Sequence, residues 1–178
     1  IDIGNTTIGI GGFQGNKLLF IEKISSRRPL SDAGYIEKLN MILNKHGLSA
    51  EAFEGSMISS VVPSVTAVFS SALETFLGRK PLILSHKLDL GYEICTEFPE
   101  KVGCDRLADI AGAISRYSLP FVTIDLGTAT TFNVLDESRR FLGGLILPGV
   151  GTAHTALLGK TSQLPKGDTH MPAHTPAS

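Results

Sequence analysis

An aspartate followed two residues later by a glycine occurs twice in this chain, in nearly the same context. The first copy, IDIGNT, opens the chain, and the second, IDLGTA, begins at Ile124. In the first copy, Gly4 lets backbone amides approach a phosphate closely, while Asn5 and Thr6 supply side-chain donors. Asp2 is suited to hold Mg²⁺ through water, because this ion keeps much of its hydration shell. The stretch is therefore either a phosphate-binding loop or an ordinary Gly/Asn turn.

The repetition favours the phosphate-binding interpretation. The Asp and the Gly recur at one constant offset as Asp125 and Gly127, and each copy is followed by a strand, a tight turn and a returning strand. In the second copy, Gly127, Thr128 and Thr130 would supply an opposing set of ligands. Two such hairpins facing each other across a cleft would hold a nucleotide phosphate chain from both sides. The repeat is too long for a solenoid and predicts two similar subdomains.

A further acidic site lies in VGCDR, just before a predicted helix. Asp105 and Asp109 are four residues apart and therefore share one face of that helix. Asp105 either serves a site or only caps the helix and interacts with its dipole. Arg106 beside it is either a clamp for a carboxylate or a surface cation. The residues alone leave both alternatives open.

Other features of the chain exclude several classes of protein. The stretch GIGGFQG is followed by a strand and not by the helix that a dinucleotide fingerprint requires. The five histidines show no ligand grouping, and two cysteines, Cys95 and Cys104, favour reduced thiols over a disulfide framework. The net charge of −1 provides no basic field for nucleic acid or membrane. No signal peptide and no spanning apolar run is visible, so we expect a cytoplasmic protein.

Hairpins mixed with strand–helix–strand crossovers predict an α/β fold with mixed sheets. The expected elements are a hairpin over 1–25, a helix over 31–47, a strand over 56–62, a helix over 63–78, a strand at 81–85, a helix over 101–117 and a second hairpin from 119 onward. We predict an N-terminal subdomain over 1–118 and a C-terminal subdomain over 119–178. The second is shorter than a full match to the first would require, and we expect it to be incomplete.

Five blocks of sequence resemble one known family. They are IDIGNTT, SSVVPSVT, GCDRLADIAGA, IDLGTATTFNVLD and GGLILPGVGTAHTAL, and their order is that of the type III pantothenate kinases. This family belongs to the acetate kinase/sugar kinase/hsp70/actin superfamily. The resemblance implies a duplicated actin-like ATPase fold of two ribonuclease-H-like subdomains that clasp ATP. It also implies phosphorylation of pantothenate to 4'-phosphopantothenate, the first step of coenzyme A biosynthesis.

The resemblance also implies roles for particular residues. The ATP contacts are Asp2, Ile3, Gly4, Asn5, Thr6, Thr7, Gly127 and Thr128. The substrate contacts are Tyr92, Gly103, Cys104, Asp105 and Arg106, with Asp105 as the general base. Asp125 would hold a monovalent cation, K⁺ or NH₄⁺, in addition to the Mg²⁺ held through water by Asp2. A homodimer is implied, with pantothenate near its interface.

The chain departs from the family pattern in two places. Cys104 stands where the family has a small residue such as alanine. Near the end, Asp168 and Thr169 echo only weakly a Gly-x-Asn/Asp-Thr motif that touches substrate in the family. Two alternatives to the kinase therefore stay open. One is a non-catalytic relative that acts as a regulatory or binding protein, of the transcription accessory factor type, and the other is a phosphohydrolase of the polyphosphate type.

Overall fold

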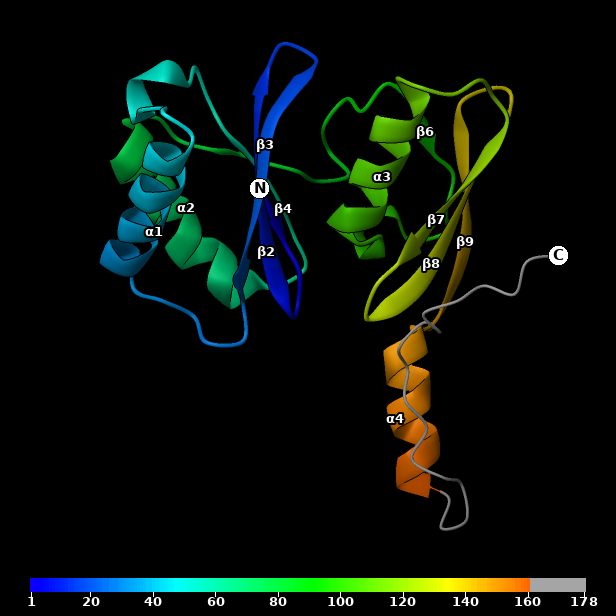
Figure 1. The fold of residues 1–178 in the computed structure, drawn as a ribbon. Coiled ribbons are helices and arrows are strands. Elements are labelled where there is room, and N and C mark those ends of the chain that lie inside the picture. The colour runs from blue at the N-terminus through cyan, green and yellow to red at the C-terminus, as the bar shows by residue number, and fades with distance from the viewer. Residues whose placement is uncertain (161–178) are drawn as a thin grey trace, which may run out of the picture.

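The computed structural model describes residues 1–160, which form two β-sheets and four α-helices (Figure 1). The first sheet has the strand order β3-β2-β1-β4-β5, and the second has the order β6-β9-β8-β7. Each sheet mixes parallel and antiparallel pairs, as the sequence predicts. Within the described part of the chain, no helix has the length and apolar content needed to cross a bilayer.

The first sheet is built on the N-terminal hairpin. Its strands are β1 (Asp2–Ile3), β2 (Thr7–Gln14), β3 (Lys17–Ser25), β4 (Met57–Ser60) and β5 (Leu82–Ile83). The turn between β2 and β3 has Gly15 at a φ of 57°, a left-handed conformation that glycine adopts without strain. Side chains alternate across β1, so Ile3 is fully buried in the core while Asp2 lies on the opposite face of the sheet.

Helices α1 (Asp32–Lys45) and α2 (Pro63–Leu77) pack on the buried face of this sheet. Ser31 caps α1 by accepting a hydrogen bond from the backbone N–H of Gly34, and Pro63 occupies the first turn of α2. Gly78 ends α2 with a left-handed conformation. The fully buried residues of this core include Ile3, Ile8, Tyr35, Ile58 and Phe69.

The second sheet consists of β6 (Glu93–Ile94), β7 (Phe121–Leu126), β8 (Ala129–Leu135) and β9 (Arg140–Pro148). Helix α3 (Cys104–Ile114) lies between the two sheets (Figure 1) and contacts β4 on one side and β7 and β8 on the other. Ile110 packs with Leu135 and Phe141 in a second, smaller core. The predicted subdomain boundary at residue 118 stays a prediction, although β6, which belongs to the second sheet, and α3, which packs on it, both precede that residue.

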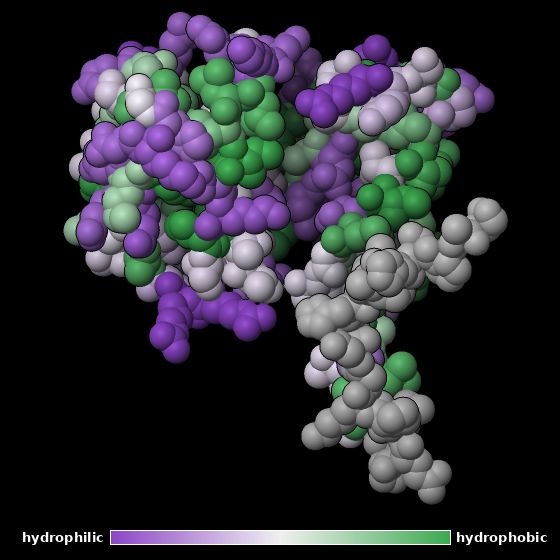
Figure 2. Space-filling view, viewed as in Figure 1, coloured by the Kyte–Doolittle hydropathy of each residue, from purple (hydrophilic) through white to green (hydrophobic). Residues whose placement is uncertain are grey.

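The face of the second sheet that points away from α3 is largely open. The register aligns Ile124 with Phe132 and Leu145, and Leu126 with Leu147 through Thr130. Residue pairs that stand directly opposite share one face of a sheet. Of the described residues on this face, Leu126 is 76% exposed and Leu145 is 62% exposed. Figure 2 shows hydrophobic residues on the surface of this part of the molecule.

Helix α4 (Val150–Lys160) follows β9 and extends away from the sheets (Figure 1). None of its residues is buried. In chain order α4 corresponds to α1. Helix α1 follows β1, β2 and β3, and α4 follows β7, β8 and β9. The remaining sequence predictions near the chain end, on Asp168, Thr169, His170 and His174, fall outside the described residues.

Candidate active site

The two Asp-x-Gly loops meet across the space between the sheets. The first loop, residues 4–6, joins β1 to β2, and the second loop, residues 127–128, joins β7 to β8. The Oγ1 atoms of Thr6 and Thr128 are 3.4 Å apart, although 122 residues separate them in the chain. The sequence predicted two hairpins facing each other, and this contact brings their tips together.

The two loops have related backbone geometry. The amide of Gly4 donates to the carbonyl of Thr7 at 3.0 Å, and the amide of Gly127 donates to the carbonyl of Ala129 at 2.9 Å. The second turn is therefore one residue tighter than the first. Asn5 and Thr128 are exposed and accessible to a ligand, whereas the side chain of Ile3 is buried in the core. Of the predicted ATP contacts, Ile3 can contribute only its backbone.

The start of α4 supports the second loop. The hydroxyl of Thr152 donates to the carbonyl of Thr128 at 2.7 Å, and the amide of Gly149 donates to the same carbonyl at 3.0 Å. A Cβ atom on Gly149 would overlap the carbonyl oxygen of Gly127, so only glycine permits this close approach. These contacts hold the first turn of α4 against the loop.

Asp105 lies in the first turn of α3, where Gly103 precedes the helix. One carboxylate oxygen of Asp105 accepts a hydrogen bond from the backbone N–H of Arg106 at 2.8 Å. A Cβ atom on Gly103 would overlap this carboxylate. A glycine at position 103 of the Gly-x-Asp-Arg motif therefore leaves room for the carboxylate of Asp105 in this position. Asp105 is the second residue of α3 and accepts from the N–H of the third, so this local contact at the helix start fits both alternatives, a site acid and a capping acid.

Four carboxylates face one another around α3. Burial raises the pKa of Asp2, and the carboxylates of Asp105 and Asp125 raise it further. Burial also raises the pKa of Asp109 to about 6, and Asp125, Asp105 and Asp2 add to this rise in that order. Asp2 comes from β1, Asp125 from β7, and the other two from α3. The fold thus gathers acids from three elements and concentrates negative charge in the cleft.

A cavity of about 370 Å³ lies beside two of these acids. Asp109 and Asp125 line it together with Thr123, small residues of α3, and Arg116 and Tyr117. The cavity therefore offers a polar space between α3 and β7.

Arg106 is tied to the second sheet. Its Nε atom donates to Oδ1 of Asn133 at 2.6 Å, and its Nη2 atom donates to the carbonyl of Phe132 at 3.2 Å. Asn133 is fully buried and its amide nitrogen donates to Thr123 at 2.9 Å. Burial lowers the pKa of Arg106 from its ordinary value. The guanidinium thus positions α3 on β8, and its remaining N–H groups are the ones available to a substrate carboxylate.

Tyr92 and Cys104 each make a hydrogen bond that involves α3, which begins at Cys104. The hydroxyl of Tyr92 donates to the carbonyl of Leu107 at 3.0 Å, and burial raises its pKa. Its ring packs on the smaller core. The thiol of Cys104 donates to the carbonyl of Leu84 at 3.1 Å. Both predicted substrate contacts therefore have structural partners in the described part of the chain.

The acid cluster suits a cation that keeps its water. Among residues 1–160, no group of three or more His, Cys, Asp or Glu side chains is arranged to enclose a metal directly. Mg²⁺ in nucleotide sites is held by one or two carboxylates, waters and phosphates, and the carboxylate of Asp2 is a ligand of the chemical type that this ion prefers. Burial is the main cause of the raised pKa values of Asp2 and Asp109, and the neighbouring carboxylates add to it.

Three residues of the site are not predicted from the sequence. Asp109 shares a helical face with Asp105 in the sequence pattern, but its approach to Asp125 depends on how α3 packs. Asn133 lies inside a strand pattern that has no distinguishing signal. Thr152 carried a weak signal, because it follows Gly149 and Gly151 where a helix begins beside the repeated loop.

Two mixed sheets joined around a cleft, each with an Asp-x-Gly loop at its edge, define the class of two-subdomain actin-like ATPase folds. The model of the family described as "Type III pantothenate kinase" matches residues 1–178. The chain belongs to this family of kinases, as the five sequence blocks indicate.

Individual relatives agree with this assignment. A type III pantothenate kinase of Bifidobacterium animalis subsp. lactis is 39% identical over 166 residues, covering 93% of this chain and 66% of the relative. That of Finegoldia magna is 35% identical over 172 residues, covering 97% of this chain and 66% of the relative. The chain thus spans slightly less than two thirds of the length of these curated relatives.

A solved structure has the same fold. It is the crystal structure of a conserved Baf family transcriptional activator from Campylobacter jejuni. The superposition has a TM-score of 0.53 at 16% sequence identity, and it covers 99% of this chain and 67% of that chain. At this identity the likeness concerns the fold alone.

Proposed function

We propose that this chain contributes the ATP and pantothenate sites of an enzyme that phosphorylates pantothenate to 4'-phosphopantothenate, the first step of coenzyme A biosynthesis. The observation that carries the proposal is the meeting of the two Asp-x-Gly loops at Thr6 and Thr128, with Asp105 close enough to affect the pKa of Asp2. Family membership supports the same reaction. The cytoplasm remains the location that we expect from the sequence.

In this proposal the two loops hold ATP. Backbone amides of Asn5, Thr6 and Thr128 face the phosphates, because those of Gly4 and Gly127 donate to carbonyls within their own turns. The hydroxyls of Thr6 and Thr128 separate to admit the phosphates. Asp2 orients Mg²⁺ through its waters, and the ion when bound offsets the phosphate charge. Asp125 holds K⁺ or NH₄⁺, and Asp109 lies beside it in the same cavity.

Pantothenate is held by the Gly-x-Asp-Arg motif and by Tyr92. Arg106 has free N–H groups for the carboxylate, while its Nε atom stays on Asn133. The residues around Tyr92 give the apolar contact, and Gly103 and Cys104 offer backbone groups. We also propose a homodimer through the exposed side of α3, where Ala108, Ala111 and Gly112 would let another backbone approach closely.

Asp105 acts as the general base. The primary hydroxyl of pantothenate attacks the γ-phosphorus of ATP, forming one P–O bond while the bond to the β,γ-bridging oxygen breaks and ADP leaves. The proton of the hydroxyl passes to Asp105. Because phosphoryl transfer usually has a loose transition state, this proton leaves late. The carboxylate therefore mainly orients the hydroxyl oxygen in line with the γ-phosphorus and accepts the proton at the end.

The test is a coupled assay of ADP release with and without pantothenate, on the parent and on two variants. Asp105→Asn keeps the hydrogen bond to the hydroxyl but cannot accept its proton, so we expect kcat to fall by about 10²–10⁴. Asp32→Asn is the matched control, since Asp32 is also an acid in the first turn of a helix, α1, on the far side of the first sheet. We expect the control to retain kcat.

Each outcome separates the candidate functions. ADP release that depends on pantothenate supports the kinase, and release without pantothenate indicates a phosphohydrolase. ATP binding with no turnover in either case supports the regulatory relative. A near-normal kcat in Asp105→Asn with a lowered melting temperature would mean that Asp105 only stabilises α3. Full turnover in a buffer that contains Na⁺ as its only monovalent cation would contradict the proposed cation site.

A further inference from the structure

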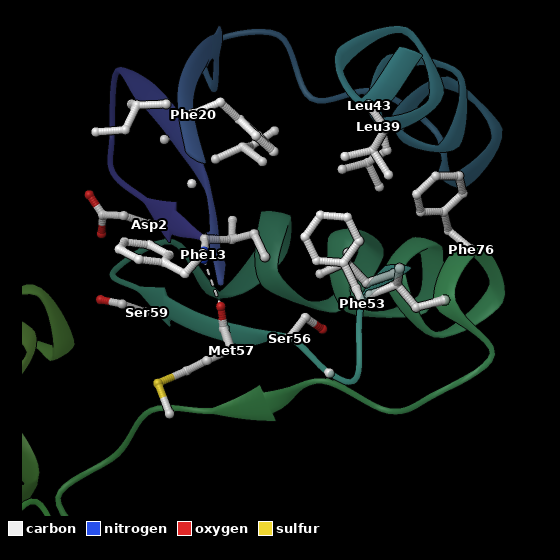
Figure 3. A pocket seen from close by; sticks show the side chains of 18 of the residues that line it. Asp2, Phe13, Phe20, Leu39, Leu43, Phe53, Ser56, Met57, Ser59 and Phe76 are labelled. Carbon is white, nitrogen blue, oxygen red and sulfur yellow. Dashed lines mark hydrogen bonds between the residues drawn. The ribbon is translucent and has the colours of Figure 1, made fainter. Parts of the chain in front are cut away.

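The carboxylate of the proposed acceptor substrate needs a cationic partner in a region that is rich in acids. Asp2 and Ser59 lie on neighbouring strands of the first sheet (Figure 3), and among the described residues no lysine, arginine or histidine side chain lines that side of Asp2. Two arginines lie at the ends of α3. The side chain of Arg116 is exposed and has no hydrogen-bond partner in residues 1–160, whereas that of Arg106 is held in place. Arg106 is therefore the better prepared partner for an anion.

Rigid groups of the second sheet hold the guanidinium of Arg106. Its Nε atom donates to Oδ1 of Asn133 at 2.6 Å, and its Nη2 atom donates to the carbonyl of Phe132 at 3.2 Å. The guanidinium also lies over the fully buried ring of Phe141, 5.5 Å from the ring centroid. A Cβ atom on Gly144 would lie 3.0 Å from Nη2, so glycine leaves space for the guanidinium. The remaining N–H groups can bind a ligand with little loss of side-chain entropy, because the guanidinium is already fixed.

Asn133 is a neutral anchor for this cation. A guanidinium only donates, so the amide oxygen of Asn133 must face it, and the amide nitrogen then donates to Oγ1 of Thr123 at 2.9 Å. Asp105 accepts from the backbone N–H of Arg106 and not from its guanidinium. None of the ion pairs in the described part of the chain involves Arg106. The guanidinium is thus positioned by a partner that brings no charge.

We propose that Asn133 determines the specificity of the site for an acidic acceptor, because it fixes the guanidinium of Arg106 without neutralising it. This role rests on the proposed function and adds the means by which the chain distinguishes an anionic acceptor from a neutral one of similar shape. An aspartate at position 133 has the same shape and could accept from Nε of Arg106 and from the hydroxyl of Thr123. It would therefore keep the hydrogen bonds, but it would pair with the guanidinium and neutralise it.

Asn133→Asp tests this role by isothermal titration calorimetry with two compounds. One is pantothenate, and the other is pantothenol, in which a CH₂OH group replaces the carboxylate. We expect the affinity of the variant for pantothenate to fall by about 10–100-fold, because a hydrogen-bonded charge contact is lost, while its affinity for pantothenol stays within about twofold of the parent. Asn16→Asp, the same substitution in the exposed turn between β2 and β3, is the matched control and should bind both compounds like the parent.

A second measurement needs neither compound and no variant at position 133. An anchored arginine gives a separate Nε–H signal in a ¹H–¹⁵N spectrum, and the signal that is lost in Arg106→Lys identifies Arg106. We expect its proton to exchange with water at least about tenfold more slowly than those of exposed arginines, because the Nε–H group is bonded to Asn133. Exchange as fast as that of exposed arginines would overturn the anchoring by Asn133, even where Asn133→Asp does not fold.

The titrations separate this role from the proposed function. A parent chain that binds neither compound would contradict the proposed function and this role together. A parent that binds pantothenate, with the same affinity in Asn133→Asp, would contradict the role of Asn133 alone. An equal loss of affinity for pantothenate and pantothenol would also overturn it, since Asn133 would then shape the site without selecting for charge.

Discussion

Replacing Asp109 with asparagine should stabilise the protein at neutral pH. The side chain of Asp109 lies in the cavity between α3 and β7, and burial together with three other carboxylates raises its pKa from 3.8 to about 6. Between these two values the folded chain keeps a proton that the unfolded chain has released. The free energy of unfolding therefore falls as the pH rises through this window, and the loss is complete above the folded-state pKa.

The magnitude follows from the shift. A rise of roughly two pKa units corresponds to about 3 kcal/mol at ~1.4 kcal/mol for each unit. Asp109 is only partly buried and water screens part of the repulsion, so about 1–2 kcal/mol is the expected effect. Asparagine is neutral at every pH and avoids this loss. For a chain of this size the gain corresponds to about 2–8 °C in melting temperature near pH 8.

The assay is thermal unfolding followed by circular dichroism, from about pH 4 to about pH 8, at low salt and without divalent cations. The Asp109→Asn variant should match the parent near pH 4, where Asp109 is largely protonated, and exceed it near pH 8. Asp32→Asn removes a half-buried acid from the first turn of α1, far from the acid cluster, and should gain no stability at either pH. A variant that is less stable than the parent near pH 8 would refute the repulsion of Asp109 by its neighbours.

Three further predictions concern strand packing, a helix cap and the core. Gly144→Ala would place a Cβ on the carbonyl of Phe132 and should lower the melting temperature by several degrees, whereas Gly151→Ala meets open space and should not; equal effects would contradict the close strand contact. Ser31→Ala removes the cap of α1 and should cost about 1 kcal/mol in urea unfolding; no change in the midpoint would mean that the cap contributes nothing. Phe69→Ala empties a fully buried position and should cost about 3–5 kcal/mol by the same measurement, and a loss below about 1 kcal/mol would place Phe69 outside the core.

Local signals predicted much of the fold. Ser31, Pro63 and Gly78 mark helix ends through their own backbone and hydrogen-bonding chemistry, and the structure places them there. The Asp-x-Gly repeat predicted a pair of hairpins because strand alternation and turn residues are also local. The predicted strand over 56–62 is confirmed, with observed bounds at Met57–Ser60.

Contacts between distant segments could not be read in this way. In α3, Ala113 is buried together with Leu107 and Ile110, because the helix packs between two sheets and not on one. The short strand β6 pairs with β9 across a long stretch of chain, and a two-residue strand has no periodicity to detect. The approach of Asp109 to Asp125 depends on that same packing, so this one member of the acid cluster could not be placed in the site from the sequence.

The open face of the second sheet has a consequence for how the protein behaves in solution. In the repeated Asp-x-Gly stretch, Leu126 corresponds to Ile3. The side chain of Leu126 is 76% exposed, whereas that of Ile3 is fully buried. Two chains could associate by pressing these leucine-rich faces together, and such clustering strengthens in sulfate and grows with concentration. In a light-scattering measurement, association through these faces would raise the apparent mass in the same way as the proposed dimer through α3. A charged substitution such as Leu145→Lys, which leaves α3 untouched, separates colloidal clustering from true assembly.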